Sequence, residues 1–119
     1  MTFSLIENDT PLPAARTSGF RNAEFKRLAG LYSRACSAKI IADMAVDVDM
    51  DEGICSFSYF HARQSPAALT FVVRHAGPRT NMYELWAEGR GKIEKSGLFA
   101  RIYERLEQEI GQLGTSARN

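Results

Sequence analysis

Hydrophobic and polar residues recur with two different periods along the chain, and these periods divide it into helices and strands. A spacing of three and four residues predicts a first helix that begins near Asn22, a good N-cap residue, with Glu24 in its first turn. Its apolar stripe contains Phe25, Leu28, Ala29, Tyr32, Ala35, Cys36 and Ile40. A second stripe of the same period predicts a last helix over residues 98–113, which Gly114 ends.

Between the two helices the period falls to two, which predicts four strands. The first contains Met44, Val46, Val48 and Met50, which alternate with aspartates. The second passes through residues 55–59, the third covers 69–75 and the fourth covers 82–87. Short loops join them, which implies an antiparallel meander. Glycines at positions 89 and 91 are expected to mark the end of the sheet.

The strand registers can be tested against one another, because antiparallel pairing fixes the sum of the paired residue numbers. The first turn pairs Val48 with Cys55, the second pairs Tyr59 with Val73, and the third pairs Val73 with Tyr83. All three registers place the odd-numbered side chains from 55 to 85 on one apolar face. We therefore expect both helices to cover that face.

The width of the sheet agrees with this arrangement, because four strands span roughly 19 Å and two helices packed about 8–10 Å apart cover that distance. The predicted fold is α+β, a two-layer sandwich of order α-β-β-β-β-α, with a four-stranded antiparallel meander and both helices on one face. Residues 20–114 are expected to form a single domain. Residues 1–19 form an N-terminal arm or tail, and residues 115–119 a C-terminal tail.

The opposite face of the predicted sheet is polar except for three side chains, Phe60, Val72 and Trp86. The predicted registers place Phe60 opposite Val72 and place Trp86 beside Thr70 and Ala62, so the three side chains form an apolar patch. Exposed aromatic clusters mark association surfaces, and we interpret the patch as an interaction surface. Two alternatives remain: cover by the N-terminal arm through Phe3, Leu5 and Ile6, or a ligand groove.

Composition narrows the class of protein. The 119 residues carry a net charge of +1, without the basic excess of a nucleic-acid-binding protein. The N-terminal residues lack the pattern of a signal peptide, and no stretch approaches the ~20 apolar residues of a membrane span. Cys36 and Cys55 fit no metal spacing, and we expect both to be reduced and buried. These features predict a cytoplasmic protein.

Catalytic and metal motifs are weak in this sequence. The registers place His75 diagonal to Cys55, which makes these two residues a candidate nucleophile and base, but no third group or oxyanion donor accompanies them. The acidic run from Asp47 to Gly53 lacks the glycine and glutamate of a calcium loop at the required positions. We interpret it as an acidic strand face, and we expect neither a metal nor a cofactor.

Basic residues gather before the last helix and form a candidate anion-binding site, although a solvated loop explains them better: Arg79, Arg90, Lys92, Lys95 and Arg101.

The sequence therefore predicts a non-catalytic protein-interaction or regulatory module that uses the outer face of its sheet and forms a homodimer. The partner is a protein or a second copy, with no nucleic acid and no membrane. The first alternative is a small-molecule-binding protein with a cavity between the sheet and the helices, lined by the hydroxyl groups of Tyr32, Tyr59, Tyr83 and Tyr103. The second alternative is a cysteine-dependent enzyme built on Cys55 and His75.

Overall fold

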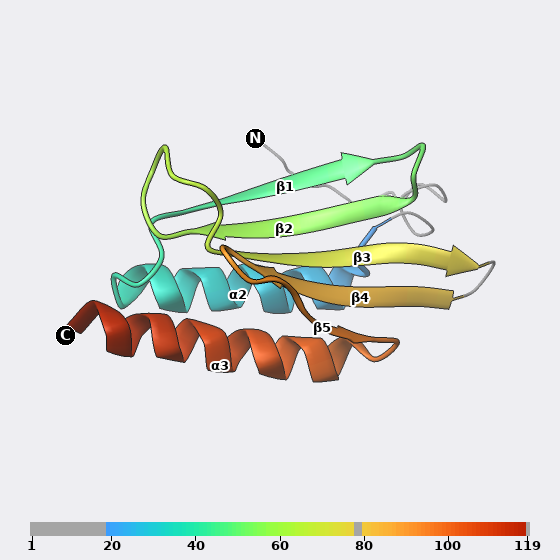
Figure 1. The fold of residues 1–119 in the computed structure, drawn as a ribbon. Helices are drawn as coiled ribbons and strands as arrows, with labels where there is room; N and C mark the ends of the chain where they lie inside the picture. Colours follow the sequence, from blue (N-terminus) through green and yellow to red (C-terminus); the bar gives the residue numbers. More distant parts are fainter. Residues whose placement is uncertain (1–18, 78–79, 119) are drawn as a thin grey trace.

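The structure, a computed structural model, describes residues 19–77 and 80–118 (Figure 1). These residues form two helices and five strands, and all five strands lie between the two helices in the sequence. In chain order the elements are α2 (Asn22–Ser37), β1 (Asp43–Asp49), β2 (Ile54–Phe60), β3 (Leu69–Gly77), β4 (Thr80–Ala87), β5 (Gly91–Ser96) and α3 (Phe99–Arg118). The five strands form one antiparallel sheet of order β1-β2-β3-β4-β5. The predicted arm up to residue 18 lies outside the described residues.

The prediction of four strands is wrong, because residues 91–96 form a fifth strand after β4. The segment carries one strongly apolar side chain, Ile93, so it lacks the alternation that identified the other strands. Gly89 and Gly91 do not end the sheet. Their φ angles of 78° and 76° lie in the left-handed region, and they turn the chain back beside β4.

The first helix begins where the sequence predicted, with Arg21 rather than Asn22 as its N-cap. The Glu24 side chain accepts the Arg21 backbone N–H at 3.0 Å, which satisfies one free donor at this helix end. At the other end, Lys39 adopts a φ of 63°, and the chain turns so that Ile40 donates its N–H to Ala35.

The apolar stripe of α2 is rotated relative to the prediction. Its buried residues are Glu24, Leu28, Leu31 and Ala35. Cys36 is exposed, so the prediction that both cysteines are buried is wrong for this one. Cys36 lies in the last turn of the helix, which ends at Ser37, and it is not among the buried positions of α2.

Two of the three predicted strand registers are confirmed. Val48 pairs with Cys55, and Val73 pairs with Tyr83. The second register is wrong by four residues, because Val73 lies opposite Cys55 instead of Tyr59. The β2–β3 loop is centred on residue 64 rather than 66, and Gln64 at its centre adopts a φ of 65°. A shift of four residues preserves the strand phase, so the odd-numbered side chains still share the apolar face.

Both helices contact these odd-numbered side chains. The ring of Phe25 in α2 lies 5.7 Å from that of Phe57, and the ring of Phe99 in α3 lies 5.2 Å from that of Phe71. In Figure 1 both helices run along the same side of the sheet. The largest fully buried side chains are Tyr59, Phe57, Phe71, Leu28, Ile41, Leu69, Leu85, Ile102 and Leu106.

Strand β1 extends beyond the cover of the helices. Val46 and Val48 point to the helix side but remain 42% and 49% exposed, and Met50 beyond the strand end is 57% exposed. The fifth strand explains this exposure. Five strands span about 24 Å, whereas two helices cover about 20 Å. Figure 1 shows β1 at the edge of the sheet farthest from α3.

Helix α3 continues through Gly114, which was predicted to end it, and reaches Arg118, so residues 115–118 belong to the helix and not to a tail. Gly114 instead permits close packing. A Cβ atom at this position would lie 2.8 Å from Cδ1 of Ile40, in the segment that follows α2. The glycine therefore fits the helix against this segment.

Candidate interaction surface

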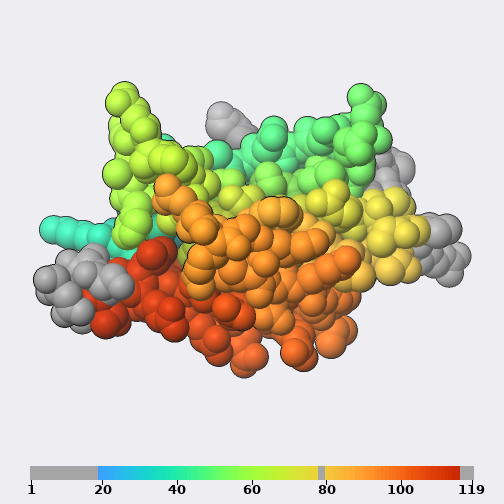
Figure 2. Space-filling model, in the orientation of Figure 1, coloured from blue at the N-terminus to red at the C-terminus, as the bar shows by residue number. Residues whose placement is uncertain are grey.

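The outer face of the sheet carries rows of side chains that run across the strands from β1 to β5. One row contains Ala45, Ser58, Thr70, Trp86 and Lys92, and the next contains Asp47, Ser56, Val72, Glu84 and Lys95. The predicted phase is confirmed, since Trp86 lies opposite Thr70 on this face while its neighbour Leu85 is fully buried beneath the sheet. In Figure 2 the strands, coloured green to orange, form one broad surface that α3 borders below.

A network of charged and aromatic groups centres on Glu84, which is only 3% exposed although it lies on the outer face. Arg74 donates from Nε and Nη2 to the two carboxylate oxygens, at 3.3 and 3.2 Å. Trp86 donates its indole Nε1–H to Oε1 at 3.0 Å. Lys92 Nζ lies 3.7 Å from Oε2 and 5.7 Å from the centre of the Trp86 ring. The network links β3, β4 and β5.

The environment of Glu84 determines its ionisation. Burial alone raises the pKa of a carboxyl group, but hydrogen bonds from Arg74 and Trp86, together with the charges of Arg74 and Lys92, more than offset that effect. The pKa of Glu84 is therefore lowered, and the group is a carboxylate at neutral pH. The negative charge keeps the three donors in place around it.

Among the described residues of this face, Trp86 is the most exposed large apolar side chain, with 38% of its surface exposed. Phe60 is half-buried and Val72 is 7% exposed. The corrected β2–β3 register places Val72 opposite Ser56 rather than opposite Phe60, and Thr70 opposite Ser58 rather than Ala62. The three predicted patch residues therefore share the outer face without forming one contiguous apolar patch, because polar side chains separate Phe60 from Trp86.

Arg74 and Glu84 were not singled out by the sequence. Both stand at outward positions of an alternating strand, where charged side chains are ordinarily solvated. Their spacing of ten residues does not by itself indicate an ion pair. The β3–β4 register is needed, because it pairs Arg74 with Met82 and so places Arg74 diagonal to Glu84. The register was predicted, so this ion pair could have been found from it.

The candidate anion-binding residues do not form one free basic cluster. Arg90 pairs with Glu109, Lys92 with Glu84, and Arg101 with Glu94. Lys95 is exposed on β5, and Arg79 lies outside the described residues. Carboxylates thus accompany three of these five cations.

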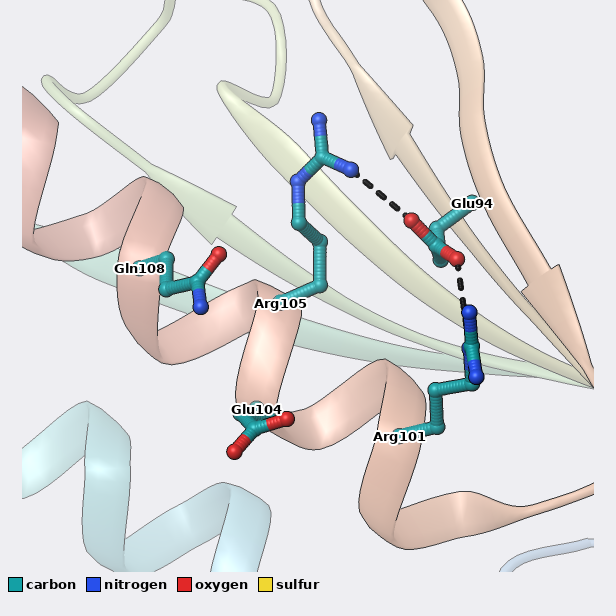
Figure 3. A pocket seen from close by; sticks show the side chains of 5 residues that line it. All are labelled: Glu94, Arg101, Glu104, Arg105 and Gln108. Carbon is teal, nitrogen blue, oxygen red and sulfur yellow. Dashed lines mark hydrogen bonds and ion pairs between the residues drawn. The ribbon is translucent and has the colours of Figure 1, made fainter.

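Of the candidate anion-binding residues, Arg101 lines a shallow hollow between β5 and α3 with a volume of about 310 Å³ (Figure 3). Glu94 lies between Arg101 and Arg105, which it pairs with at 3.6 and 2.8 Å, and Glu104 and Gln108 of α3 complete the lining. Every lining side chain is polar or charged, and the central charges neutralise one another.

Cys55 and His75 lie in different environments. The thiol of Cys55 is buried, 4% exposed, and burial raises its pKa. The His75 side chain is exposed, and its backbone N–H bonds to Gly53. A buried thiol with a raised pKa is a poor nucleophile at neutral pH.

The tyrosine hydroxyls predicted to line a cavity are bonded within the protein: Tyr32 bonds to Cys36, and the other three bond to α2. Tyr59 donates to the Leu28 carbonyl at 2.8 Å, Tyr103 to the Arg27 carbonyl at 3.2 Å, and Tyr83 to Glu24 at 2.7 Å. Burial, with the hydrogen bond to Glu24, raises the pKa of Tyr83 to about 12. These hydroxyls anchor α2 and do not line a cavity.

Within residues 19–77 and 80–118, no group of His, Cys, Asp and Glu side chains is arranged to hold a metal ion. Neither described helix has the length and apolarity needed to cross a membrane. Comparisons with protein-family models, with curated proteins and with solved structures find no match to this chain.

Proposed function

We propose that this protein is a non-catalytic interaction module that binds a protein partner through the outer face of its sheet, with Trp86 as the anchor. The proposal rests on the exposure of the Trp86 side chain and on the contacts that hold it. Its indole is 38% exposed on a sheet face that the described helices leave open, and it is held by Glu84 and Lys92.

A fixed aromatic side chain is well suited to binding. Tryptophan, tyrosine and arginine are the residues that most often dominate the free energy of protein association. Binding also orders side chains, at a cost of about 0.5–1.5 kcal/mol for each one immobilised. Because the hydrogen bond from Trp86 to Glu84 already restricts the indole, this cost is reduced before a partner arrives.

The two alternatives have less support. A small-molecule cavity requires unfilled space and free polar groups between the sheet and the helices, but the hydroxyls of Tyr59, Tyr83 and Tyr103 are already bonded. A cysteine-dependent enzyme requires a reactive thiolate, and the buried Cys55 is poorly suited to provide one.

The experiment compares Trp86→Ala with Phe25→Ala, since both aromatic side chains are 38% exposed but Phe25 lies on α2, on the other side of the sheet. Each variant and the wild type are immobilised and used to capture proteins from a cell lysate, and each is measured by light scattering over a range of concentrations. Wild type and Phe25→Ala should associate with the same partner or with themselves, and Trp86→Ala should lose that association. An association unaffected by Trp86→Ala, or a wild type that binds nothing and stays monomeric, contradicts the proposal.

A further inference from the structure

The outer face of the sheet is divided by charge. Asp43, Asp47 and Asp49 lie on β1 at one edge, and Lys92 and Lys95 lie on β5 at the opposite edge. One row runs across all five strands from Asp47 to Lys95. Both end residues are exposed, and neither takes part in an ion pair within the described part of the chain. Each edge therefore presents uncompensated charge, negative on one side and positive on the other.

We infer that the partner of this face is a second copy of the chain, docked face to face about a two-fold axis that runs along β3. The inference rests on the proposed function and names its partner. Rotation about this axis exchanges the two edges of the sheet, so β1 of one copy lies over β5 of the other, while positions along the strands are preserved. Asp47 then faces Lys95 of the second copy, and the contact occurs twice in each dimer.

The same charges exclude the other simple face-to-face arrangement. A two-fold axis that crosses the strands would place β1 over β1 of the second copy, and the acidic edges would meet. Like charges in contact across an interface cost free energy and select against that orientation. The distribution of aspartate and lysine thus selects the axis along the strands.

The arrangement also gives Trp86 apolar neighbours across the interface. Trp86 lies in a row that pairs through Thr70 with Ser58, so the symmetry places the indole over Ser58 of the second copy, with Phe60 two residues further along the same strand. Side chains that are separated within one copy become neighbours across the interface.

The size of the face suffices for a dimer. Five strands span about 24 Å and seven residues span about 23 Å, which gives a flat area of roughly 550 Å². Side-chain relief increases the accessible area toward the ~800 Å² per partner of a standard interface. The expected dimer is therefore of moderate stability and depends on its charges.

Charge reversal tests the arrangement. Asp47→Lys and Lys95→Asp each replace two attractive contacts in the dimer by two repulsive ones, and each should raise the dimer dissociation constant by at least about tenfold in sedimentation equilibrium. An equimolar mixture of the two variants should recover dimers within about threefold of the wild-type constant, because every contact in the mixed dimer is again complementary. Asp51→Lys, in the turn after β1, and Lys26→Asp, on α2, are the matched controls and should leave the constant unchanged.

Several results would overturn the inference. The wild type could stay monomeric up to about 0.5 mM. The dimer dissociation constant could be unchanged by both charge reversals, or the mixture of the two variants could fail to form dimers. Assemblies larger than a dimer would show that β1 and β5 pair edge to edge in an open chain instead. A protein that binds no partner through Trp86 would contradict the proposed function itself. A monomer that still binds another protein through Trp86 would contradict only the homodimer.

Discussion

Trp86 and Glu84 stand two residues apart on the same strand, and the indole Nε1–H donates to the Glu84 carboxylate at 3.0 Å. Both side chains lie on the outer face, where the exposed ring is held by a carboxylate that is itself 3% exposed. The orientation of the largest exposed aromatic side chain on this face therefore depends on the ionisation of one buried acid.

Replacement of this acid should reveal that dependence. Glu84→Gln keeps the shape of the side chain but removes its charge from Arg74 and Lys92, so the free energy of unfolding at pH 7 should fall by about 1–2 kcal/mol. The folded-state pKa of Glu84 is lowered. Its contribution is thus complete above the unfolded carboxyl pKa of about 4.3 and is lost as the pH falls through the folded value. The difference between wild type and Glu84→Gln, measured by urea unfolding, should shrink below about pH 4.

Glu109 provides the matched control for this experiment. It is also buried, and Arg90 and Arg105 lower its pKa against the opposing effect of burial. Glu109→Gln should also lower the free energy of unfolding at pH 7, by an amount that shrinks at acid pH, but it should leave the fluorescence of Trp86 unchanged. Glu84→Gln should lower the free energy of unfolding and also change the fluorescence. A Trp86 signal that responds equally to the two substitutions would contradict the role given to Glu84.

The incomplete cover of β1 predicts unequal effects at two valines. Val48 and Val73 lie on either side of Cys55 and point to the same face, but Val48 is 49% exposed and Val73 is 2% exposed. Val73→Thr buries a hydroxyl and should lower the free energy of unfolding by about 1–3 kcal/mol, whereas Val48→Thr should change it by less than about 0.5 kcal/mol. Chemical denaturation measures both, and equal costs would show that β1 is covered in solution.

Two glycines of α3 should respond differently to replacement by alanine. A Cβ atom at Gly111 meets nothing within 4 Å, so Gly111→Ala should stabilise the protein by about 0.5–1 kcal/mol through helix propensity. At Gly114 the same atom would lie 2.8 Å from Ile40 Cδ1, and the gain should be cancelled or reversed. Adding Ile40→Val to Gly114→Ala removes the clashing atom and should recover part of the loss. Equal stabilisation at both glycines in thermal unfolding would contradict the close packing at Gly114.

The two thiols should react at different rates. Cys36 is exposed and Cys55 is buried with a raised pKa. Titration of the native protein with an aromatic disulfide reagent at pH 7 should modify one thiol rapidly, and the second only when the protein unfolds. Cys36→Ser should abolish the rapid phase. A rapid phase that survives this substitution would reveal an accessible Cys55 and restore the enzyme alternative.

The sequence predicts correctly which strand side chains face the helices, because this depends only on whether a residue number is odd or even. The β2–β3 register was wrong by four residues, yet Phe57 and Phe71 still lie on the buried face, since an even shift moves no side chain across the sheet. The loop that caused the error turns at Gln64, a residue without the conformational freedom of glycine, so its sequence gave no sign of the turn centre.

The fifth strand and the contacts of Lys92 with Glu84 and Trp86 could not be predicted, for a shared reason. Residues 91–96 become a strand through pairing with β4 and packing against α3, and not through a periodic pattern of their own. Without that strand Lys92 has no place beside Trp86 and Glu84, although the Arg74–Glu84 pair follows from the predicted β3–β4 register. The burial of Glu84 results from side chains that three strands bring together.

The indole N–H resonance of Trp86 offers the most direct test of the proposed interaction surface, since this tryptophan is the single one in the sequence. Two-dimensional ¹H–¹⁵N spectra follow it without interference as the protein concentration is raised from the micromolar to the millimolar range. The resonance should shift or broaden with concentration in the wild type, and the same change should be delayed to higher concentration in Asp47→Lys. A resonance that stays constant in the wild type over the whole range, alone and with added cell lysate, would contradict an interaction surface centred on Trp86.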